Sequence, residues 1–418
     1  MVAVTDTRAN SNYDIVIVGG GMVGISLALL LRAQRPWKIL VVEAQELAVS
    51  DSPVSGAYSS SFDARSTALS WSSRNIYQSI AVWPQLKRHL AAIAQIHVSD
   101  RGHAGLTRID AADANVDALG YVVENQWLGS VLLNQLAETD IQLLGSAGVE
   151  TIVPLAAGMR LGVQQSDQDL QTIDAKLVVI ADGAGSSTSK KLGIQSQSST
   201  YGQTGIIANI SLEKPHGGVA YERFTDQGPM ALLPLTDFKG RPRSALVWTQ
   251  PSEMAESLMA ADEQSFLEQL QTRFGYRLGR FKQLGERVAY PLALTTATEQ
   301  MRRHLVVMGN AAHSLHPVAG QGFNLSLRDA ATLANSLAQA GEAIGDLAVL
   351  QQYQQQQAAD QRNTVLFSDS LPKLFGLSSS VIALGRNSGL LAMDLIPSLR
   401  NSFARFGMGM ATREPGHG

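Results

Sequence analysis

The sequence predicts an α/β fold, with an open and mainly parallel sheet interrupted by an antiparallel-sheet domain and followed by a helical C-terminal region. Three observations lead to this prediction. A β-branched run enters a glycine-rich loop within residues 13–24, and strand-like runs punctuated by Pro and Gly dominate residues 204–293. A second strand, glycine-rich loop and helical segment then follow in residues 305–329. This order indicates one α/β domain that the antiparallel sheet divides in two.

Composition narrows the class of protein. The chain has 418 residues, of which 45% are hydrophobic and 17% charged, as in a globular protein with room for more than one domain. The formal net charge of −3 gives no reason to expect nucleic acid as a partner. There is no cysteine, which excludes disulfides, thiolate metal sites and cysteine nucleophiles and suits a reducing compartment. Residues 1–12 do not resemble a signal peptide, and no apolar run reaches about 18 residues. We expect a cytoplasmic protein; contact with the inner face of a membrane stays open.

The N-terminal segment has the order strand, glycine loop, helix and strand. Tyr13–Val18 is a β-branched run typical of a buried parallel strand, and residues 19–24 follow as GGGMVG. Ile25–Arg32 is apolar and helical in character, and Lys38–Val42 is a second strand that ends at Glu43. This is the βαβ context that a G-x-G-x-x-G motif requires, so we predict a Rossmann-like dinucleotide site.

Each residue of this motif has a physical role. Gly19 would make the tight turn, Gly21 would let the backbone approach a pyrophosphate, and Gly24 would let helix and strand pack closely. Glu43 follows Gly19 by 24 positions, near where an acid accepts a hydrogen bond from a ribose hydroxyl. An acidic residue there favours FAD or NAD over NADP.

The next segments alternate between the two domains. Residues 51–61 read as a loop, and we expect a helix from Ser70 through Leu90. Arg65, just before it, fits either a surface salt bridge or a contact with the cofactor. Strands are expected over Ile96–Arg108 and Gly120–Glu124, and Asn125 opens a helix that it could simply cap.

A second ligand-binding corner is predicted near residue 182. Val149–Val153 and Met159–Gln165 resemble a hairpin, and Ala175–Ala181 is a buried-type strand that ends at Asp182-Gly183. An acid at the carboxyl end of a parallel strand lies where open α/β sheets bind ligands, although Asp-Gly is also a common turn. The inserted sheet should then follow, with strands over 205–210, 219–224, 230–235 and 245–249 and a helix over Glu263–Phe274.

The third corner begins with the strand Leu305–Met308 and Gly309-Asn310. His313, His316 and Pro317 follow in a loop that leads through Gly320 into a helix. The two histidines have no evident third ligand, so we predict no metal site. One of them could transfer a proton, but hydrogen bonds to the backbone that shape the loop are the simpler interpretation.

The C-terminal part is expected to be helical from Gly341 onward. Residues 351–357 form a glutamine-biased run, read as a solvated helix face. Leu374–Phe406 is apolar with scattered Arg and Lys, which fits either a helical pair packed on the body or a lipid-facing surface.

Three motifs in this order, GGGMVG, ADGAGS and GNAAHSLHPVAGQGFNLSLRD, resemble those of the group A flavoprotein aromatic hydroxylases, which share the para-hydroxybenzoate hydroxylase fold. Within that group the chain is most similar to the ubiquinone-biosynthesis hydroxylases, through DARSTALS, IHVSDRGHAG and GYVVEN at residues 63–70, 96–105 and 120–125, and through Gly389–Arg405. The subfamily it matches best hydroxylates 2-octaprenyl-6-methoxyphenol. The resemblance covers nearly the whole chain and implies a glutathione-reductase-type FAD domain.

The resemblance also implies the roles of individual residues. The glycines of the first motif would hold the FAD pyrophosphate and Glu43 the adenosine ribose, while Pro317 would line the isoalloxazine. The remaining expected contacts with FAD come from Arg65, Asn125, Asp182, Gly183, Asn310, Gly320, Gly322, Phe323 and Asn324. Two positions depart from the group: Asn310 stands where an Asp is usual, and Ser189-Lys190 stands where an Arg often follows the Asp-Gly motif.

The implied activity is hydroxylation of a polyprenylated phenol, with non-covalent FAD, O₂ and a flavin C4a-hydroperoxide, and with Pro317 and His316 beside the reacting groups. No second G-x-G-x-x-G is present, so NAD(P)H would bind transiently at the flavin. The alternatives are a sister hydroxylase of the same pathway, a flavin oxidase or dehydrogenase, and a flavin-binding assembly subunit. Other ubiquinone-biosynthesis proteins and a second copy of the chain are candidate partners.

The expected domain division is discontinuous. Residues 1–72, 117–192 and 286–345 would form the FAD domain, 73–116 and 193–285 the substrate-binding sheet domain, and 346–418 the C-terminal helical region.

Overall fold

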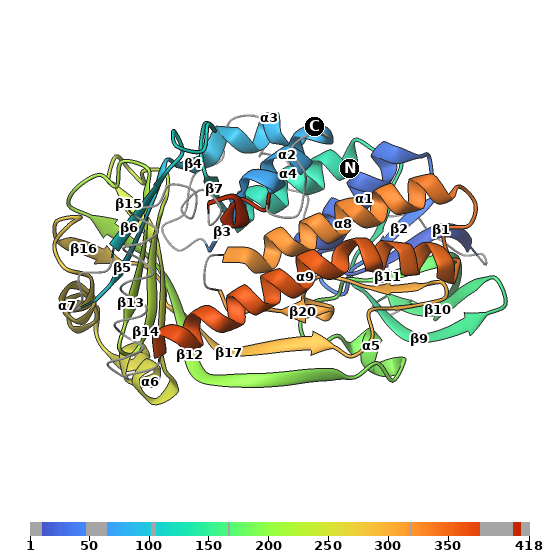
Figure 1. Ribbon diagram of the computed structural model, residues 1–418. Coiled ribbons are helices and arrows are strands. Elements are labelled where there is room, and N and C mark those ends of the chain that lie inside the picture. Colours follow the sequence, from blue (N-terminus) through green and yellow to red (C-terminus); the bar gives the residue numbers. More distant parts are fainter. Residues whose placement is uncertain are drawn as a thin grey trace.

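The computed structural model describes residues 11–46, 65–101, 106–165, 168–317, 320–376 and 404–410. They form an eight-stranded sheet and a nine-stranded sheet, with a three-stranded sheet between them (Figure 1). The predicted α/β fold with an inserted antiparallel sheet is confirmed.

The eight-stranded sheet has a parallel centre in the order β19-β11-β1-β2-β8. Its strands are β1 (Ser11–Val18), β2 (Ile39–Val42), β8 (Gln142–Leu144), β11 (Gln171–Ile180) and β19 (Leu305–Val307). Residues of β1 alternate between two cores: Ile15 and Ile17 pack on one side, Val16 and Val18 on the other. Because both faces are covered, the strand reads as a continuous apolar run.

Helices cover one face of this sheet, and a hairpin covers the other. The helices are α1 (Met22–Gln34), α4 (Asn125–Ala137), α8 (Gln321–Ala340) and α9 (Leu347–Gly376). Strands β9 (Ala147–Leu155) and β10 (Gly158–Gln165) pair antiparallel, which confirms the predicted hairpin, and β10 continues onto β11. The short strand β18 (Met301–Arg302) pairs antiparallel with β19 and is the edge strand on that side. Helix α5 (Ser187–Lys191) follows β11.

The small sheet has the order β3-β7-β4, with bounds Ser66–Ser70, Gly120–Glu124 and Leu90–Ile93. The expected single helix from Ser70 to Leu90 is wrong. The chain forms α2 (Trp71–Ser79), α3 (Trp83–Leu86) and a 3₁₀ turn over Lys87–His89. Ala81 has φ +58° and Pro84 stands in the first turn of α3, so the α-helical hydrogen bonds cannot continue through this stretch.

The nine-stranded sheet has the order β20-β17-β12-β15-β14-β13-β5-β6, with β16 beside β12. Its strands are β5 (Gln95–Asp100), β6 (Leu106–Asp110), β12 (Ser196–Leu212), β13 (Val219–Thr225), β14 (Gly228–Pro234), β15 (Arg243–Pro251), β16 (Phe281–Leu284), β17 (Val288–Ala297) and β20 (His313–Ser314). Helices α6 (Ser252–Ala260) and α7 (Glu263–Phe274) pack on its outer face. The long strands β12 and β17 run from this sheet toward α5 and the first sheet (Figure 1).

The division into domains stays a prediction. Tyr77 and Leu86 lie in the segment assigned to the substrate domain, yet they pack into the core under α1 and α4. In the glutamine run, five residues are exposed, whereas Tyr353 and Gln357 are buried, and Gln357 donates to the Arg328 carbonyl at 2.8 Å.

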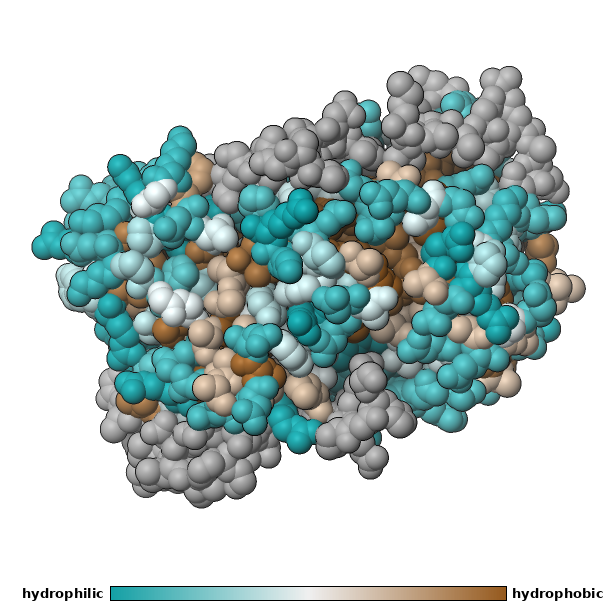
Figure 2. All heavy atoms as spheres, turned by 90° about the horizontal axis from the view of Figure 1, so that it is seen from above, coloured by the Kyte–Doolittle hydropathy of each residue, from teal (hydrophilic) through white to brown (hydrophobic). Residues whose placement is uncertain are grey.

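The predicted apolar segment Leu374–Phe406 lies mostly outside the described residues. Its far end is described: Ala404 packs with Ile93 and Ile109, and the Phe406 ring lies 4.5 Å from that of Phe367 on α9. These contacts place residues 404–406 on the protein body. Within the described ranges no helix is long and apolar enough to span a membrane. Figure 2 shows apolar side chains reaching the surface in the middle of the helical side, with hydrophilic ones toward both ends.

Candidate functional site

The glycine loop at the end of β1 has the geometry that its motif predicts. A Cβ on Gly24 would lie 1.9 Å from the carbonyl oxygen of Gly19, so only glycine lets α1 pack this closely on the loop. Gly19 has φ +112°, and a Cβ there would lie 2.4 Å from the Ala181 carbonyl oxygen. Nothing lies within 4 Å of a Cβ built on Gly21. Two glycines are therefore required for packing, and the third leaves the backbone open to a ligand.

Glu43 follows β2 and holds this loop in place. Its carboxylate accepts hydrogen bonds from the N–H of Gly20 at 2.6 Å and of Gln45 at 2.9 Å. A carboxylate has about four lone-pair directions, so hydroxyl donors can still bind to it.

The second corner lies at the end of the adjacent parallel strand, β11. Asp182 Oδ2 accepts from the Thr188 N–H at 3.2 Å, while Oδ1 is buried and has no hydrogen-bond partner among the described residues. Gly183 has φ +87° and open space where a Cβ would stand. A buried carboxylate oxygen left without a donor indicates that a ligand can supply one.

Arg65 and Asn125 are brought together by the pairing of β3 with β7. The Asn125 N–H donates to the Arg65 carbonyl at 2.8 Å, and Thr67 Oγ1 donates to Asn125 Oδ1 at 2.7 Å. Asn125 is not the N-cap of α4, because Glu124 holds that position. The Arg65 side chain is exposed and donates to the Tyr290 hydroxyl at 2.7 Å, so its described contact is a phenol and not a carboxylate.

The third corner begins at the end of β19. Gly309 has φ +65° and faces Val23 of α1, and Asn310 is exposed in a 3₁₀ turn, Gly309–Ala311. Because β1, β11 and β19 are parallel neighbours, Gly19, Asp182 and Asn310 all lie at the same edge of the sheet.

Helix α8 starts beside the small sheet. Its N-cap, Gly320, is in the left-handed conformation with φ +58° and makes no side-chain cap. The N–H groups of the next three residues, Gln321, Gly322 and Phe323, have no acceptor within the helix.

Asn324 fixes this helix end. Its amide nitrogen donates to the carbonyls of Ala68 and Gly320, and its oxygen accepts from the Ser70 N–H and the Ser73 hydroxyl. All four hydrogen bonds are between 2.6 and 2.9 Å long. The side chain is fully engaged, so it orients α8 toward β3 and has no bond left for a cofactor.

The two loop histidines have separate environments. His313 bonds through Nε2 to the carboxylate of Asp329 at 2.8 Å, so its partner is a side chain on α8 and not the backbone that we expected. His316 is buried against the Tyr201 ring, with centroids 5.1 Å apart, and burial lowers its pKa to about 4. His316 is therefore neutral at pH 7, and Pro317, which follows it, is half-buried. Among the described residues no group of three His, Asp or Glu side chains could hold a metal ion.

The sequence analysis did not predict the ion pair that joins the nine-stranded sheet to the small sheet. Arg243 of β15 is fully buried, bonds to Glu124 at the end of β7, and donates through Nε to the Thr236 carbonyl at 2.7 Å. Its guanidinium also lies 5.6 Å from the Phe238 ring centroid. The available signal was a charged residue, Arg243, placed just before the apolar run 245–248 of a predicted strand.

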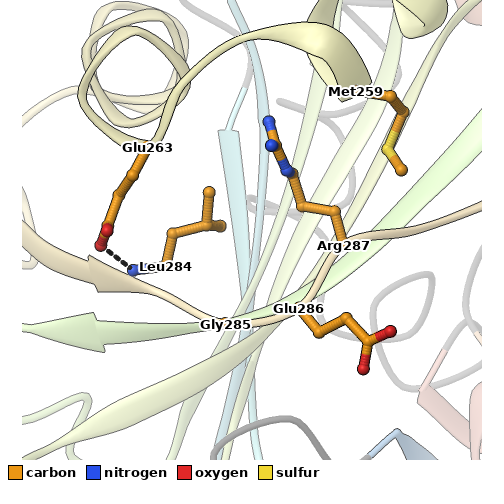
Figure 3. A pocket seen from close by; sticks show the side chains of 6 residues that line it. All are labelled: Met259, Glu263, Leu284, Gly285, Glu286 and Arg287. Carbon is orange, nitrogen blue, oxygen red and sulfur yellow. Dashed lines mark hydrogen bonds between the residues drawn. The ribbon is translucent and has the colours of Figure 1, made fainter.

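A surface hollow lies on the outer side of the nine-stranded sheet, apart from the three corners. This hollow has a volume of about 440 Å³. It lies between α6, α7 and β16 and is lined by Met259, Glu263, Leu284, Gly285, Glu286 and Arg287 (Figure 3). Glu263 accepts from the Leu284 N–H at 2.9 Å, and Arg287 donates to the Leu258 carbonyl at 2.7 Å. None of the predicted site residues lines it, so it is separate from the three corners.

The three corners fit FAD. The open backbone at Gly21 suits a pyrophosphate, and the orphaned oxygen of Asp182 suits a ribityl hydroxyl. The N–H groups of Gly322 and Phe323, which have no acceptor within α8, suit an electron-rich ring edge. Arg65 and Asn125 approach from the small sheet, which α8 contacts through Asn324.

Comparison with known proteins supports the same conclusion. The family described as "FAD binding domain" matches residues 12–368. The chain is 33% identical to ubiquinone hydroxylase UbiL of Rhodospirillum rubrum, over 96% of this chain and 90% of that one. It is 30% identical to 3-demethoxyubiquinol 3-hydroxylase of Escherichia coli, over 96% of this chain and 100% of that one. The crystal structure of p-nitrophenol 4-monooxygenase PnpA from Pseudomonas putida shares the fold, with a TM-score of 0.77, 16% identity, and coverage of 97% and 100%. The chain therefore belongs to the ubiquinone hydroxylase family of FAD-dependent monooxygenases.

Proposed function

We propose that this protein hydroxylates the aromatic ring of a polyprenylated phenol in ubiquinone biosynthesis, with 2-polyprenyl-6-methoxyphenol as the substrate. The observation that carries the proposal is the position of the FAD corners opposite an apolar sheet face. On that face the paired residues Ala231, Val247, Ile207 and Val288 form a row across four strands. Tyr290 stands two residues beyond Val288 on the same face and accepts from Arg65.

The residues that we assign to FAD divide its binding between the three corners. The loop from Gly19 to Gly24 would hold the pyrophosphate and Glu43 the adenosine ribose, while Asp182, Asn125 and Asn310 would contact the ribityl chain. Arg65 and Gly183 would lie beside the phosphates. When bound, FAD accepts electrons from NAD(P)H and transfers one oxygen atom from O₂ to the substrate.

The start of α8 supplies preorganised donors. Gly320 begins the helix, and the N–H groups of Gly322 and Phe323 would face the pyrimidine edge of the flavin, where negative charge develops on reduction. Because the side chain of Asn324 ties the helix end to Ala68 and Ser70, these donors are fixed before the cofactor binds. Pro317 would cover the reacting side of the ring and help to exclude water.

His316 is a poor candidate for the catalytic base. With a pKa of about 4 it binds a proton too weakly to take one efficiently from a phenol near pH 7. We assign it to the shape of the loop, through its contact with Tyr201. If His316→Ala lost hydroxylation while it retained FAD, this assignment would be wrong.

Two measurements test the function. Purified holoprotein with NAD(P)H, ¹⁸O₂ and 2-polyprenyl-6-methoxyphenol should place one labelled oxygen atom in the product ring, whereas an oxidase or dehydrogenase would leave the product unlabelled. Cells that lack the protein should accumulate 2-polyprenyl-6-methoxyphenol. A different intermediate would assign another ring position, and a protein that oxidises no NAD(P)H with any phenol yet is needed for a complex would be an assembly subunit.

A further inference from the structure

Glu222 of β13 is an ionisable side chain that lies within the apolar row of the nine-stranded sheet. Tyr221 and Arg223 of β13 point to the outer side, where they line a small pocket with Phe274 and Arg277. Since strand side chains alternate, Glu222 points to the opposite side, with Ala220 and Phe224. Glu222 pairs with Val98 on β5 and Ala231 on β14, so it continues the apolar row described above.

This face is the one turned toward the FAD corners. Arg243 lies four residues before Val247 on the same face and bonds to Glu124, the neighbour of Asn125. At the β17 end of the row, Tyr290 accepts a hydrogen bond from Arg65. The face therefore contacts the part of the small sheet that we assign to the flavin at two points, from β15 and from β17. Glu222 is a carboxyl group within the same row.

Glu222 is also positioned between two points where the sheet is anchored. Ala220 belongs to the cluster that includes Ile93 of the small sheet, and Phe224 packs with Val98 and with Leu371 of α9. Glu222 is half-buried between them, and no described residue forms a hydrogen bond or ion pair with its carboxyl group. A carboxyl group enclosed in this way without a partner can bind a polar group of a ligand.

We propose that the carboxylate of Glu222 binds the ring hydroxyl of the phenol substrate and accepts its proton during hydroxylation, an assignment that rests on the proposed function. The O–H bond of the phenol breaks, the proton passes to a carboxylate oxygen, and the electron pair stays on the phenol oxygen. The ring becomes more electron-rich at the positions ortho and para to that oxygen, where an electrophilic oxygen atom adds. The ring carbon that gains the oxygen atom then loses its hydrogen as a proton, the phenol oxygen takes a proton back, and the ring is aromatic again. The proton held by Glu222 is returned to water when the product leaves.

The environment of Glu222 suits this task. Burial raises its pKa to about 8, closer to the value of about 10 for a phenol than an ordinary glutamate. The other charged groups on this face are Asp100 and Arg243. Those on α9 are Asp360, Arg362, Asp369 and Lys373. None of them contributes to the raised pKa of Glu222, for which burial is the cause. The carboxyl group should therefore change its protonation state around pH 8.

The test compares Glu222→Gln with Glu256→Gln, a matched control at an exposed position on α6. In FAD-loaded protein, Glu222→Gln should lower the hydroxylation rate on the methoxyphenol substrate about 100-fold or more. The wild-type rate and that of Glu256→Gln should rise with pH to a plateau above about pH 8, and Glu222→Gln should lose this dependence. Glu222→Asp should recover part of the rate. Equal rates and equal pH profiles in wild type and Glu222→Gln would overturn the proposal.

An arm without turnover separates this proposal from the proposed function. Infrared difference spectra of the holoprotein should show the carbonyl band of a protonated carboxylic acid that titrates near pH 8 in wild type and Glu256→Gln and is missing from Glu222→Gln. A band that persists in Glu222→Gln belongs to another group and refutes the assignment. Wild-type protein that shows the band but hydroxylates no phenol would disprove the proposed function and, with it, the role of Glu222. If Glu222→Gln does not bind FAD, Glu222→Asp carries the test, and an unchanged pH profile and band in that variant refute the role.

Discussion

The buried ion pair of Arg243 and Glu124 gives the sharpest prediction, because it holds the nine-stranded sheet to the small sheet. Arg243→Met would leave the carboxylate of Glu124, whose side chain is only 4% exposed, without its cation. Breaking a buried pair in this way costs about 3–5 kcal/mol. The hydrogen bond from Nε to Thr236 is lost as well, at about 1 kcal/mol. We therefore expect a loss of about 4–6 kcal/mol in the free energy of unfolding, or about a thousandfold or more in the folding equilibrium.

Urea unfolding of FAD-saturated protein, followed by tryptophan fluorescence, measures this loss. Arg302→Met is the matched control, because it breaks a pair with Glu299 whose side chains are 39% and 40% exposed and should cost at most about 1 kcal/mol. Combining Arg243→Met with Glu124→Gln should cost less than the sum of the two single changes, by about 1–3 kcal/mol. A loss for Arg243→Met no greater than that of Arg302→Met would refute the reasoning.

Other substitutions test the FAD corners. Gly24→Ala should abolish FAD binding, read from the flavin absorbance of purified protein, because a Cβ would lie 1.9 Å from the Gly19 carbonyl oxygen. Gly21→Ala has free space for its Cβ, so stability should be unchanged while the Kd for FAD rises about tenfold; an unchanged Kd would show that no ligand passes there. Asp182→Asn should weaken FAD about tenfold or more in a fluorescence titration, since Oδ1 would lose its charge, and an unaltered Kd would remove Asp182 from the site. The pKa of His316 is about 4 in the folded protein and about 6.5 in the unfolded chain. The unfolded chain therefore takes up a proton first as the pH falls, so the folded protein is most stable above pH 6.5 and loses this stability as the pH falls toward 4. His316→Gln should flatten that acid-side decline in Tm and leave the pH profile of hydroxylation unchanged; a steep decline as in wild type would contradict the assigned burial effect.

Local patterns were sufficient for much of the fold. Helix α7 has the predicted bounds because both of its ends carry their own signals. Asp262 caps it by accepting from the Ser265 N–H at 2.8 Å, and Gly275 ends it with φ +89°. The glycine loop between β1 and α1 was predicted for the same reason, since its spacing serves contacts among near neighbours.

Contacts between distant residues could not be read from spacing. The bond of Arg65 to Tyr290 joins residues 225 positions apart, and the pair of Arg243 and Glu124 spans 119. The break at Ala81 was missed because a single left-handed residue leaves little trace in an apolar periodicity. Glu222 stood inside a predicted strand, but only the sheet order shows that its side faces the FAD corners.

The dipeptide Glu124-Asn125 connects two roles of the small sheet: it anchors the nine-stranded sheet through Glu124, and it faces the assigned cofactor site through Asn125. Glu124 ends β7, holds Arg243 of the nine-stranded sheet, and is the N-cap of α4. Asn125 begins α4 and receives the Thr67 hydroxyl on the side that we assign to the cofactor. Because successive residues share one peptide unit, the backbone at Asn125 cannot shift without moving the residue that anchors the nine-stranded sheet. The end of β7 thus sets the distance between the cofactor and the sheet that carries Glu222. A hydroxylase needs this distance fixed, because oxygen transfer requires the substrate ring and the reactive flavin to meet in one geometry.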